Sequence, residues 1–165
     1  MRRRPVPLDE LDRHLLTLLQ SDAGRTLRDL GDTVGLSPSA VQRRISRYRR
    51  DGVLDRQVAV LDPRALGGVV VAVVLVTLDR ESATHHREFR DRVLGEPRVQ
   101  QCYDVSGPWD YVVVLTATDL AESRELSALL FRDDENVKRY DTLLVHDAVK
   151  IGLTLPLSGT GTDSR

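Results

Sequence analysis

The first quarter of the chain contains two short segments in which apolar residues repeat at helical spacing. Leucines recur every three or four positions over about residues 9–20, behind Asp9, which is a suitable N-cap. A second amphipathic segment starts after Thr26, another good cap, and stops at Gly35, a residue that tolerates the left-handed conformation common at helix ends. The pattern predicts two amphipathic helices, each with one apolar face.

A third helix is expected to follow directly. Ser37 can cap its free N–H groups, Pro38 fits its first position, and Gly52 ends it. The short turn between the second and third helices is typical of a helix-turn-helix, and the β-prone residues 53–61 indicate a small wing behind it. The N-terminal region is therefore predicted to be a winged helix-turn-helix.

The two faces of the third helix differ in chemistry. Val41, Ile45 and Tyr48 fall in a narrow arc and should face the core. The opposite side carries hydroxyl, amide and guanidinium groups, which read base edges in a major groove and hold phosphates. A charge run alone is as often a solvated face, but the turn, the caps and the wing together favour double-stranded DNA as a partner. The predicted DNA-binding residues are Ser37, Ser39, Gln42, Arg43, Arg44, Ser46, Arg47 and Arg50.

The second half of the chain alternates β-prone and helical patterns. The order β-α-β-β-α-β is that of a split ferredoxin-like fold, in which helices cover one face of a sheet. The other face needs cover, and a second copy of the chain is the simplest solution, so we expect a homodimer or a larger homo-oligomer. The predicted strands are residues 69–78, 99–105, 109–116 and 137–149, and the predicted helices are 83–94 and 120–131.

Charge supports a division of the 165 residues into two domains. Residues 1–60 hold 12 Arg against 8 acidic residues, whereas residues 61–165 hold 12 basic and 17 acidic residues. A basic front and an acidic back suggest different partners for the two halves. The predicted fold class is α+β. The expected parts are a winged helix-turn-helix domain over 1–62, a linker over 63–68, a ferredoxin-like oligomerisation domain over 69–152 and a disordered Ser/Gly/Thr-rich tail over 153–165.

The sequence offers little for catalysis or for a resident cofactor. The single cysteine, Cys102, excludes a disulfide framework and a four-cysteine zinc site, and a free thiol fits a reducing, cytoplasmic compartment. No apolar run reaches the about 20 residues that a membrane-spanning helix needs, so no membrane partner is expected. His85 and His86 lack metal-ligand spacing, and there is no phosphate-binding loop or nucleophile elbow. We expect neither an enzyme nor a metal or cofactor.

Four stretches, in their order and spacing, resemble the Lrp/AsnC family, the feast/famine regulators of bacteria and archaea. They are residues 8–12 (LDELD), 34–39 (VGLSPS), 41–45 (VQRRI) and 105–111 (VSGPWDY). The resemblance covers roughly residues 8–152. It implies a sequence-specific DNA-binding transcriptional regulator that assembles through its C-terminal domain into dimers, often four around a ring to give an octamer.

The resemblance also implies a small effector, commonly an amino acid, bound between dimers near the 105–111 turn and the last strand. Asp110 suits an ammonium group and Thr142 a carboxylate, although Asp110 could equally cap the turn and the aromatic residues could only pack the hairpin. Pro108 and His146 depart from the family pattern. The effector residues implied by position are Gly107, Trp109, Asp110, Tyr111, Tyr140 and Thr142.

Two other functions remain open from the sequence. Sirohaem decarboxylases also resemble Lrp/AsnC proteins, but they have degenerate DNA-binding helices and a haem-handling histidine. The Arg-rich third helix of this chain counts against that enzyme. The other alternative is a sensor that acts only through protein contacts, which would show no salt-dependent affinity for DNA.

Overall fold

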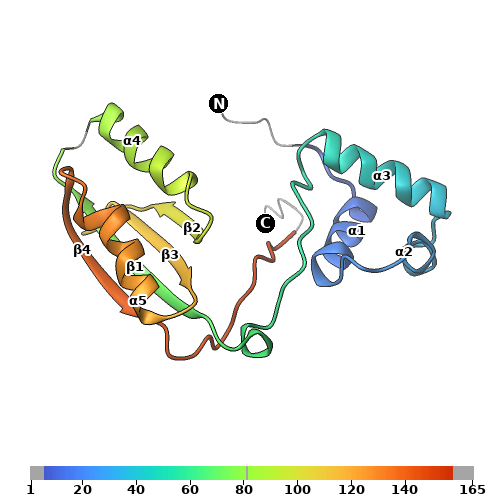
Figure 1. Cartoon of the computed structure of the whole chain (residues 1–165). Helices are drawn as coiled ribbons and strands as arrows, with labels where there is room; N and C mark the ends of the chain where they lie inside the picture. Colours follow the sequence, from blue (N-terminus) through green and yellow to red (C-terminus); the bar gives the residue numbers. More distant parts are fainter. Residues whose placement is uncertain (1–5, 81, 158–165) are drawn as a thin grey trace, which may run out of the picture. The chain divides into compact units, whose positions relative to one another are not determined.

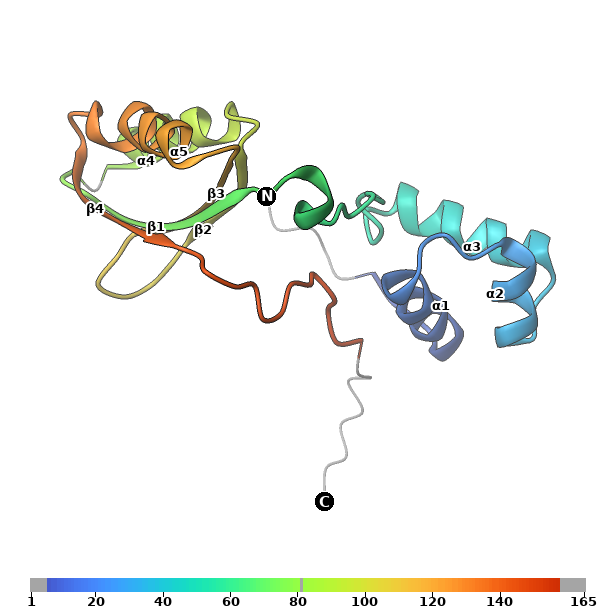
Figure 2. The ribbon, with the colours of Figure 1, turned by 60° about the horizontal axis from the view of Figure 1, so that its bottom comes forward.

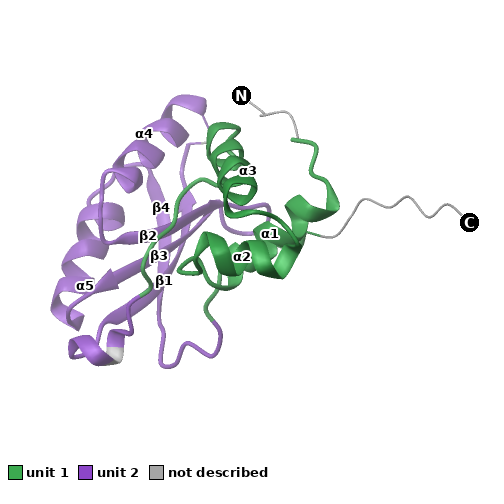
Figure 3. Ribbon diagram, turned by 90° about the vertical axis from the view of Figure 1, so that its right-hand side faces the viewer, with its two compact units in different colours: residues 1–60, 151–165 green, residues 61–150 purple. Residues whose placement is uncertain are grey.

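The computed structural model describes residues 6–80 and 82–157, which form two compact units (Figure 1). Unit 1 comprises the described parts of Met1–Val60 and Ile151–Arg165, and unit 2 comprises Leu61–Lys150 (Figure 3). Each unit has its own cluster of buried apolar side chains. The two units therefore have separate cores.

Unit 1 contains three short helices, and a side-chain cap begins each of them. They are α1 (Glu10–Ser21), α2 (Leu27–Val34) and α3 (Pro38–Arg50). Asp9 and Thr26 cap α1 and α2 as parts of capping boxes, and Ser37 caps α3. Gly35 ends α2 with φ 71°, the left-handed conformation that glycine adopts readily. The predicted helix-turn-helix is confirmed.

The core of unit 1 lies between the inner faces of these helices. Val41, Ile45 and Tyr48, which the sequence assigned to the inner face of α3, are all buried. They pack with leucines of α1 and α2, including Leu15 and Leu30. The periodicity of the sequence therefore identified the inner face of α3 correctly.

The wing predicted over residues 53–61 does not form. Residues 53–62 contain no strand. The N–H groups of Val53 and Leu54 donate to the carbonyl of Tyr48, and beyond them the chain is exposed, with Val60 87% exposed. An isolated two-stranded ribbon is at best marginally stable in water, and no partner strand pairs with this segment in the described part of the chain.

The tail predicted to be disordered makes defined contacts at its start. The side-chain amide of Gln20 in α1 donates to the carbonyl of Leu155 and accepts from its N–H, at 3.1 and 2.7 Å. Leu157 packs against the core of unit 1. An amide that pairs with both backbone groups of one residue fixes the course of the chain there, despite its simple composition. The rest of the predicted tail, residues 158–165, lies outside the described residues.

Unit 2 is a four-stranded antiparallel sheet with two helices on one face (Figure 2). Its elements are β1 (Val70–Leu78), α4 (Ala83–Leu94), β2 (Val99–Asp104), β3 (Tyr111–Ala117), α5 (Leu120–Ser127), a π-helical turn η2 (Ala128–Arg132) and β4 (Val137–Leu144). A short 3₁₀ turn, η1 (Pro63–Leu66), precedes β1. The strand order β2-β3-β1-β4 is that of the split βαββαβ arrangement, so the predicted α+β fold is confirmed.

The last strand is shorter than the predicted 137–149. β4 ends at Leu144, and the final bond to β1 runs from the N–H of Val145 to the carbonyl of Val71. Because β1 begins at Val70, residues beyond 145 have no neighbouring strand with which to continue the ladder. A strand boundary of this kind depends on the partner strand rather than on the local β-propensity.

The two faces of the sheet have different surroundings. Alternate residues of β1 and β3 are fully buried beneath α4 and α5. The opposite side, here called the open sheet face, is not covered by any helix of unit 2 in the described residues (Figure 2). Its apolar residues are Val71, Val73 and Leu75 of β1, Val112 and Val114 of β3, and Leu143 of β4. Leu143 is exposed, and the other five are partly buried in the single chain.

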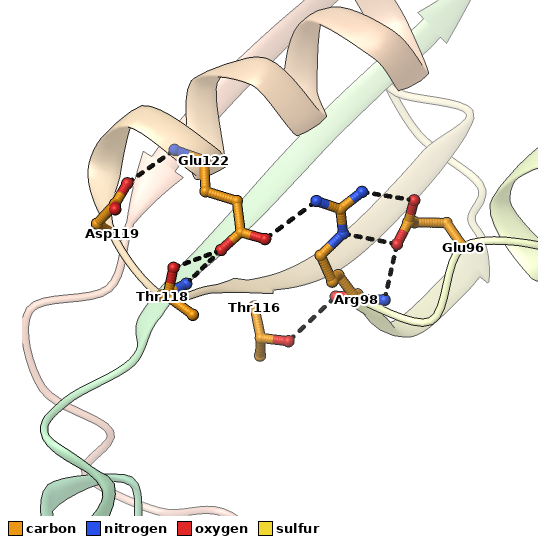
Figure 4. A network of polar contacts seen from close by, with 6 residues as sticks. All are labelled: Glu96, Arg98, Thr116, Thr118, Asp119 and Glu122. Atoms are coloured by element: carbon orange, nitrogen blue, oxygen red, sulfur yellow. Dashed lines mark hydrogen bonds and ion pairs between the residues drawn. The ribbon is translucent and has the colours of Figure 1, made fainter.

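A polar network holds the start of α5 against the start of β2 (Figure 4). The Arg98 guanidinium donates to Glu96 at 2.8 Å and to Glu122 at 3.0 Å. The other oxygen of Glu122 accepts the N–H and the hydroxyl of Thr118, both at 2.7 Å. These hydrogen bonds, with those from Thr118 foremost, lower the pKa of Glu122 to about 2.

We expect Glu122→Gln to lower the melting temperature at pH 6 and to lose that effect as the pH falls. The folded pKa of about 2 lies below the unfolded value of about 4.3. The charged carboxylate therefore stabilises the fold above about pH 4.3, and protonation removes this contribution as the pH drops toward 2. Thermal unfolding of both proteins from pH 6 to pH 3 measures it. Glu125→Gln, an exposed carboxylate on the same helix, is the control. An equal effect of Glu122→Gln at every pH would reject the charge-based explanation.

Candidate nucleic-acid interface and effector site

The outer surface of α3 carries five of the eight predicted DNA-binding side chains in exposed positions. They are Ser39, Gln42, Arg43, Ser46 and Arg50. The Gln42 amide donates to the Ser46 hydroxyl at 3.2 Å, and Arg50 pairs with its neighbour Asp51 at 3.0 Å. Arg43 has no acidic partner among the described residues. Ser37 lies at the helix N-terminus, where its hydroxyl caps the backbone.

The two remaining arginines of the predicted set, Arg44 and Arg47, turn toward α1. The Arg44 guanidinium contacts the carboxylates of Asp9, at 2.9 Å, and of Asp12. Arg47 forms an ion pair with Asp12 at 2.5 Å, without hydrogen-bonding geometry. Their side chains are 23% and 37% exposed. The predicted set therefore separates into an outward group and an internally paired group.

Asp12 is the centre of this cluster, here called the Asp12 cluster: Asp12, Asp9, Arg44, Arg47 and Tyr48. Asp12 is only 1% exposed. The Tyr48 hydroxyl donates a hydrogen bond to its carboxylate at 2.7 Å. Burial alone would raise the pKa of this carboxyl, but the hydrogen bonds from Tyr48, the Asp9 N–H and Arg44, together with the ion pair to Arg47, outweigh burial and lower the pKa to about 2. Asp12 is thus a buried, ionised and fully partnered carboxylate.

Sequence reasoning missed Asp12, although a signal was present. Leu15, Leu16 and Leu19 form the inward stripe of α1, and Asp12 stands one turn before them on the same side. A carboxylate inside an apolar stripe must find partners across the core, because a buried lone charge is strongly unfavourable. Among the described residues, the basic side chains that contact it are Arg44 and Arg47 of α3.

Tyr111, one of the predicted effector residues, belongs to the core of unit 2. Its ring lies 4.5 Å from that of Phe89, measured between centroids. Its hydroxyl lies 2.6 Å from Nδ1 of His86 and accepts a hydrogen bond from Arg90 at 3.3 Å. With 1% of the residue exposed, Tyr111 packs the hairpin, which was the alternative interpretation of this position.

Asp110 and Trp109 are also engaged within unit 2. The Asp110 carboxylate accepts the N–H of Leu78 at 2.7 Å and so ties the β2–β3 turn to the end of β1. The Arg139 guanidinium lies 4.5 Å from the centre of the Trp109 ring, a cation–π contact. Asp110 therefore has a structural partner on β1, and its proposed contact with an ammonium group stays a prediction.

The six predicted effector residues do not meet at one surface of a single chain. Tyr111 and Tyr140 flank Val76 on the helix-covered face, where Tyr140 packs against Phe131. Thr142 is exposed on the edge strand β4, and Gly107 is exposed in the turn.

Two further features of the described residues bear on function class. No group of three or more His, Cys, Asp or Glu side chains within residues 6–80 and 82–157 is arranged to hold a metal ion. Over the same residues, no helix has the length and apolar character required to cross a bilayer.

Both halves of the chain match models of known families. The AsnC-type helix-turn-helix domain matches residues 8–49, and the Lrp/AsnC ligand binding domain matches residues 71–155. The HTH-type transcriptional regulator y4tD of Sinorhizobium fredii is 35% identical over 152 residues, which is 92% of this chain and 90% of that protein.

Solved structures agree with these matches. The AsnC family transcriptional regulator from Agrobacterium tumefaciens has a TM-score of 0.82 at 30% identity, covering 91% of this chain and 97% of that one. A transcriptional regulator from Neisseria meningitidis, NMB0573, solved as an L-Met complex, has a TM-score of 0.81 at 25% identity, covering 92% and 97%.

Fold and matches together define a transcriptional regulator that joins a helix-turn-helix to a ligand-binding domain. The chain belongs to the Lrp/AsnC family, as the sequence resemblance predicted. The leucine-responsive regulatory protein of Haemophilus influenzae, 30% identical over 149 residues, is a further relative named as a regulator.

Proposed function

We propose that the protein regulates transcription by sequence-specific binding to double-stranded DNA, with α3 in the major groove. The observation that carries this proposal is the outward face of α3, where hydroxyl, amide and guanidinium groups are exposed on the second helix of a helix-turn-helix. Such groups pair with base edges, and a major groove about 12 Å wide admits one helix. This role would place the protein with the DNA, in the cytoplasm of its cell.

Arg43 is the proposed base-reading residue. It is exposed near the middle of the outward face, and no acid of the described residues neutralises it. A guanidinium that reaches a guanine binds two acceptors at once, which gives specificity as well as affinity. Gln42 and Ser46 can read neighbouring bases, while Arg50 and the N-terminus of α3 at Ser37 are suited to phosphates.

We further propose that the C-terminal domain pairs two copies of the chain through the open sheet face. The apolar residues at the centre of that face have polar neighbours at its margins, including Thr77 and Arg139. Two copies related by a two-fold axis would bind a pseudo-palindromic site, with half-sites about 34–36 Å apart or a multiple of it. Larger rings, up to the octamer that the family resemblance implies, would be built from such dimers.

We propose a separate function for each successive region of the chain. Residues 1–62 bind DNA, residues 63–68 form the linker, and residues 69–152 oligomerise and bind a small effector such as an amino acid. Support for an effector comes from the ligand-binding domain model and from the L-Met complex of the Neisseria regulator. No observation favours the tetrapyrrole enzyme or the sensor without DNA.

We expect Arg43→Ala to weaken binding and to relax the base preference at one position of each half-site. Losing one bidentate base contact costs about 1–3 kcal/mol, roughly 5–150-fold in affinity. Selection of bound duplexes from a randomised pool measures both effects. The control is Arg49→Ala on the flank of α3, where Arg49 donates to Gln57 at 2.8 Å; its preference profile should match that of the wild type. An unchanged profile for Arg43→Ala would reject the assignment.

A further inference from the structure

We propose that Asp12 is a positioning residue that makes DNA binding by α3 more selective, by holding Arg44 and Arg47 away from the phosphates. The inference rests on the proposed function, because it concerns how the same helix reads DNA. It assigns a role to a residue of α1 that does not itself lie on the outward face.

The geometry of the Asp12 cluster gives the first step. Asp12 and Asp9 supply two negative charges, and Arg44 and Arg47 supply two positive charges within contact of them. Asp12 is buried, so its ion pairs are screened less by salt than pairs at the surface. Two of the arginines on α3 are thereby paired with carboxylates of unit 1.

The second step concerns what those arginines would otherwise do. An arginine that contacts a phosphate strengthens binding to every sequence equally and adds about 0.9 to the slope of log affinity against log salt. Such contacts position a protein without reading bases. Keeping Arg44 and Arg47 internal therefore lowers binding to random DNA and leaves a larger share of the affinity to the base contacts of Gln42, Arg43 and Ser46.

The third step is mechanical. Tyr48 comes from the buried side of α3, and its hydroxyl donates to the same carboxylate oxygen that Arg44 and Arg47 contact. The Asp12 carboxylate on α1 thus contacts three residues of α3, spaced over more than one helical turn. These contacts fix the rotation of α3 about its own axis, and this rotation decides which side chains face outward.

The test compares arginine variants that remove the charge but keep the aliphatic stem. Binding is measured by fluorescence anisotropy between 50 and 300 mM KCl, on a 30-base-pair random-sequence duplex and on a duplex selected by the wild type. We expect Arg50→Met, at the residue assigned to phosphates, to lower the salt slope by about 1 per chain. Arg44→Met and Arg47→Met should leave the slope unchanged and instead lower the melting temperature. A fall in slope for Arg47→Met equal to that for Arg50→Met would overturn the proposal.

The Asp12→Asn variant tests the same idea from the other side, because it removes the carboxylate charge that pairs with the two arginines. Releasing both arginines should raise the salt slope on the random duplex by up to about 2 per chain and lower the ratio of selected to random affinity at least tenfold. Asp32→Asn, an exposed carboxylate of α2, changes the net charge equally and should do neither. If Asp12→Asn fails to fold, the arginine variants decide alone. A wild type without salt-dependent affinity for either duplex would reject the proposed function itself, whereas normal binding with an unaltered ratio in folded Asp12→Asn would reject only this inference.

Discussion

Gly31→Ala is expected to destabilise the helix-turn-helix strongly while leaving unit 2 intact. A β-carbon at this position would lie 2.4 Å from the carbonyl oxygen of Leu36, far inside any real contact. The clashing atom belongs to the backbone, which cannot swing away as a side chain could. The N–H of Leu36 also donates to the Gly31 carbonyl at 2.9 Å, so the turn would lose this hydrogen bond if it moved. We expect a loss of at least about 3 kcal/mol, the upper end of the usual cost of overpacking, from a domain with a stability of about 5–15 kcal/mol.

Urea unfolding followed by two signals measures this effect. Trp109, the only tryptophan, lies in unit 2, so its fluorescence reports that unit, whereas far-UV circular dichroism also includes the three helices of unit 1. The variant should lose helical signal at low urea and keep the fluorescence midpoint of the wild type. Gly24→Ala, in the loop before α2, should stay within about 0.5 kcal/mol of the wild type. A Gly31→Ala protein with unchanged midpoints in both signals would show that the turn tolerates a side chain.

Val73→Asp is expected to convert the protein to a monomer and to lower its affinity for DNA at least 100-fold. Val73 lies on the open sheet face between Val114 and Leu143, its neighbours on β3 and β4. A second copy would bury the new carboxylate without a partner, which is strongly unfavourable. Loss of the dimer separates the two helix-turn-helix units, and linked binding of two half-sites exceeds single binding by about 10²–10⁴.

Light scattering gives the mass directly, and 18.5 kDa is the value for one chain. Val73→Asp should give this mass and keep the circular dichroism of the wild type, because Val73 is already partly exposed in the single chain. Leu94→Asp is the matched control, since Leu94 is 80% exposed on α4 and away from the open sheet face. A wild type that runs as a monomer, or a Val73→Asp protein that keeps the wild-type mass, would contradict dimerisation through this face.

Features that depend on short-range pattern were predictable from the sequence. The caps Asp9, Thr26 and Ser37, and the inward residues of α3, follow from residue type and spacing within one or two helical turns. The order of strands and helices in unit 2 follows in the same way, because each element carries its own periodicity. These local signals gave both the helix-turn-helix and the split βαββαβ fold.

Features that depend on a distant partner were not predictable. The hydrogen bond between Tyr48 and Asp12 joins residues 36 positions apart in the sequence, and the bond from Leu78 to Asp110 joins residues 32 positions apart. Neither separation leaves a trace in local spacing. For the same reason, the end of β4 and the missing wing are set by whether a neighbouring strand is present.

Fluorescence anisotropy against DNA from upstream of the protein's own gene tests the central claim most directly. The measurement uses the full chain, a scrambled duplex of equal length and composition, and KCl at 50 and 200 mM. Our account predicts tighter binding to the upstream duplex than to the scrambled one, with both affinities falling steeply between the two salt concentrations. Equal and weak binding to both duplexes, with no dependence on salt, would contradict it and would mean that the exposed face of α3 is only a solvated surface.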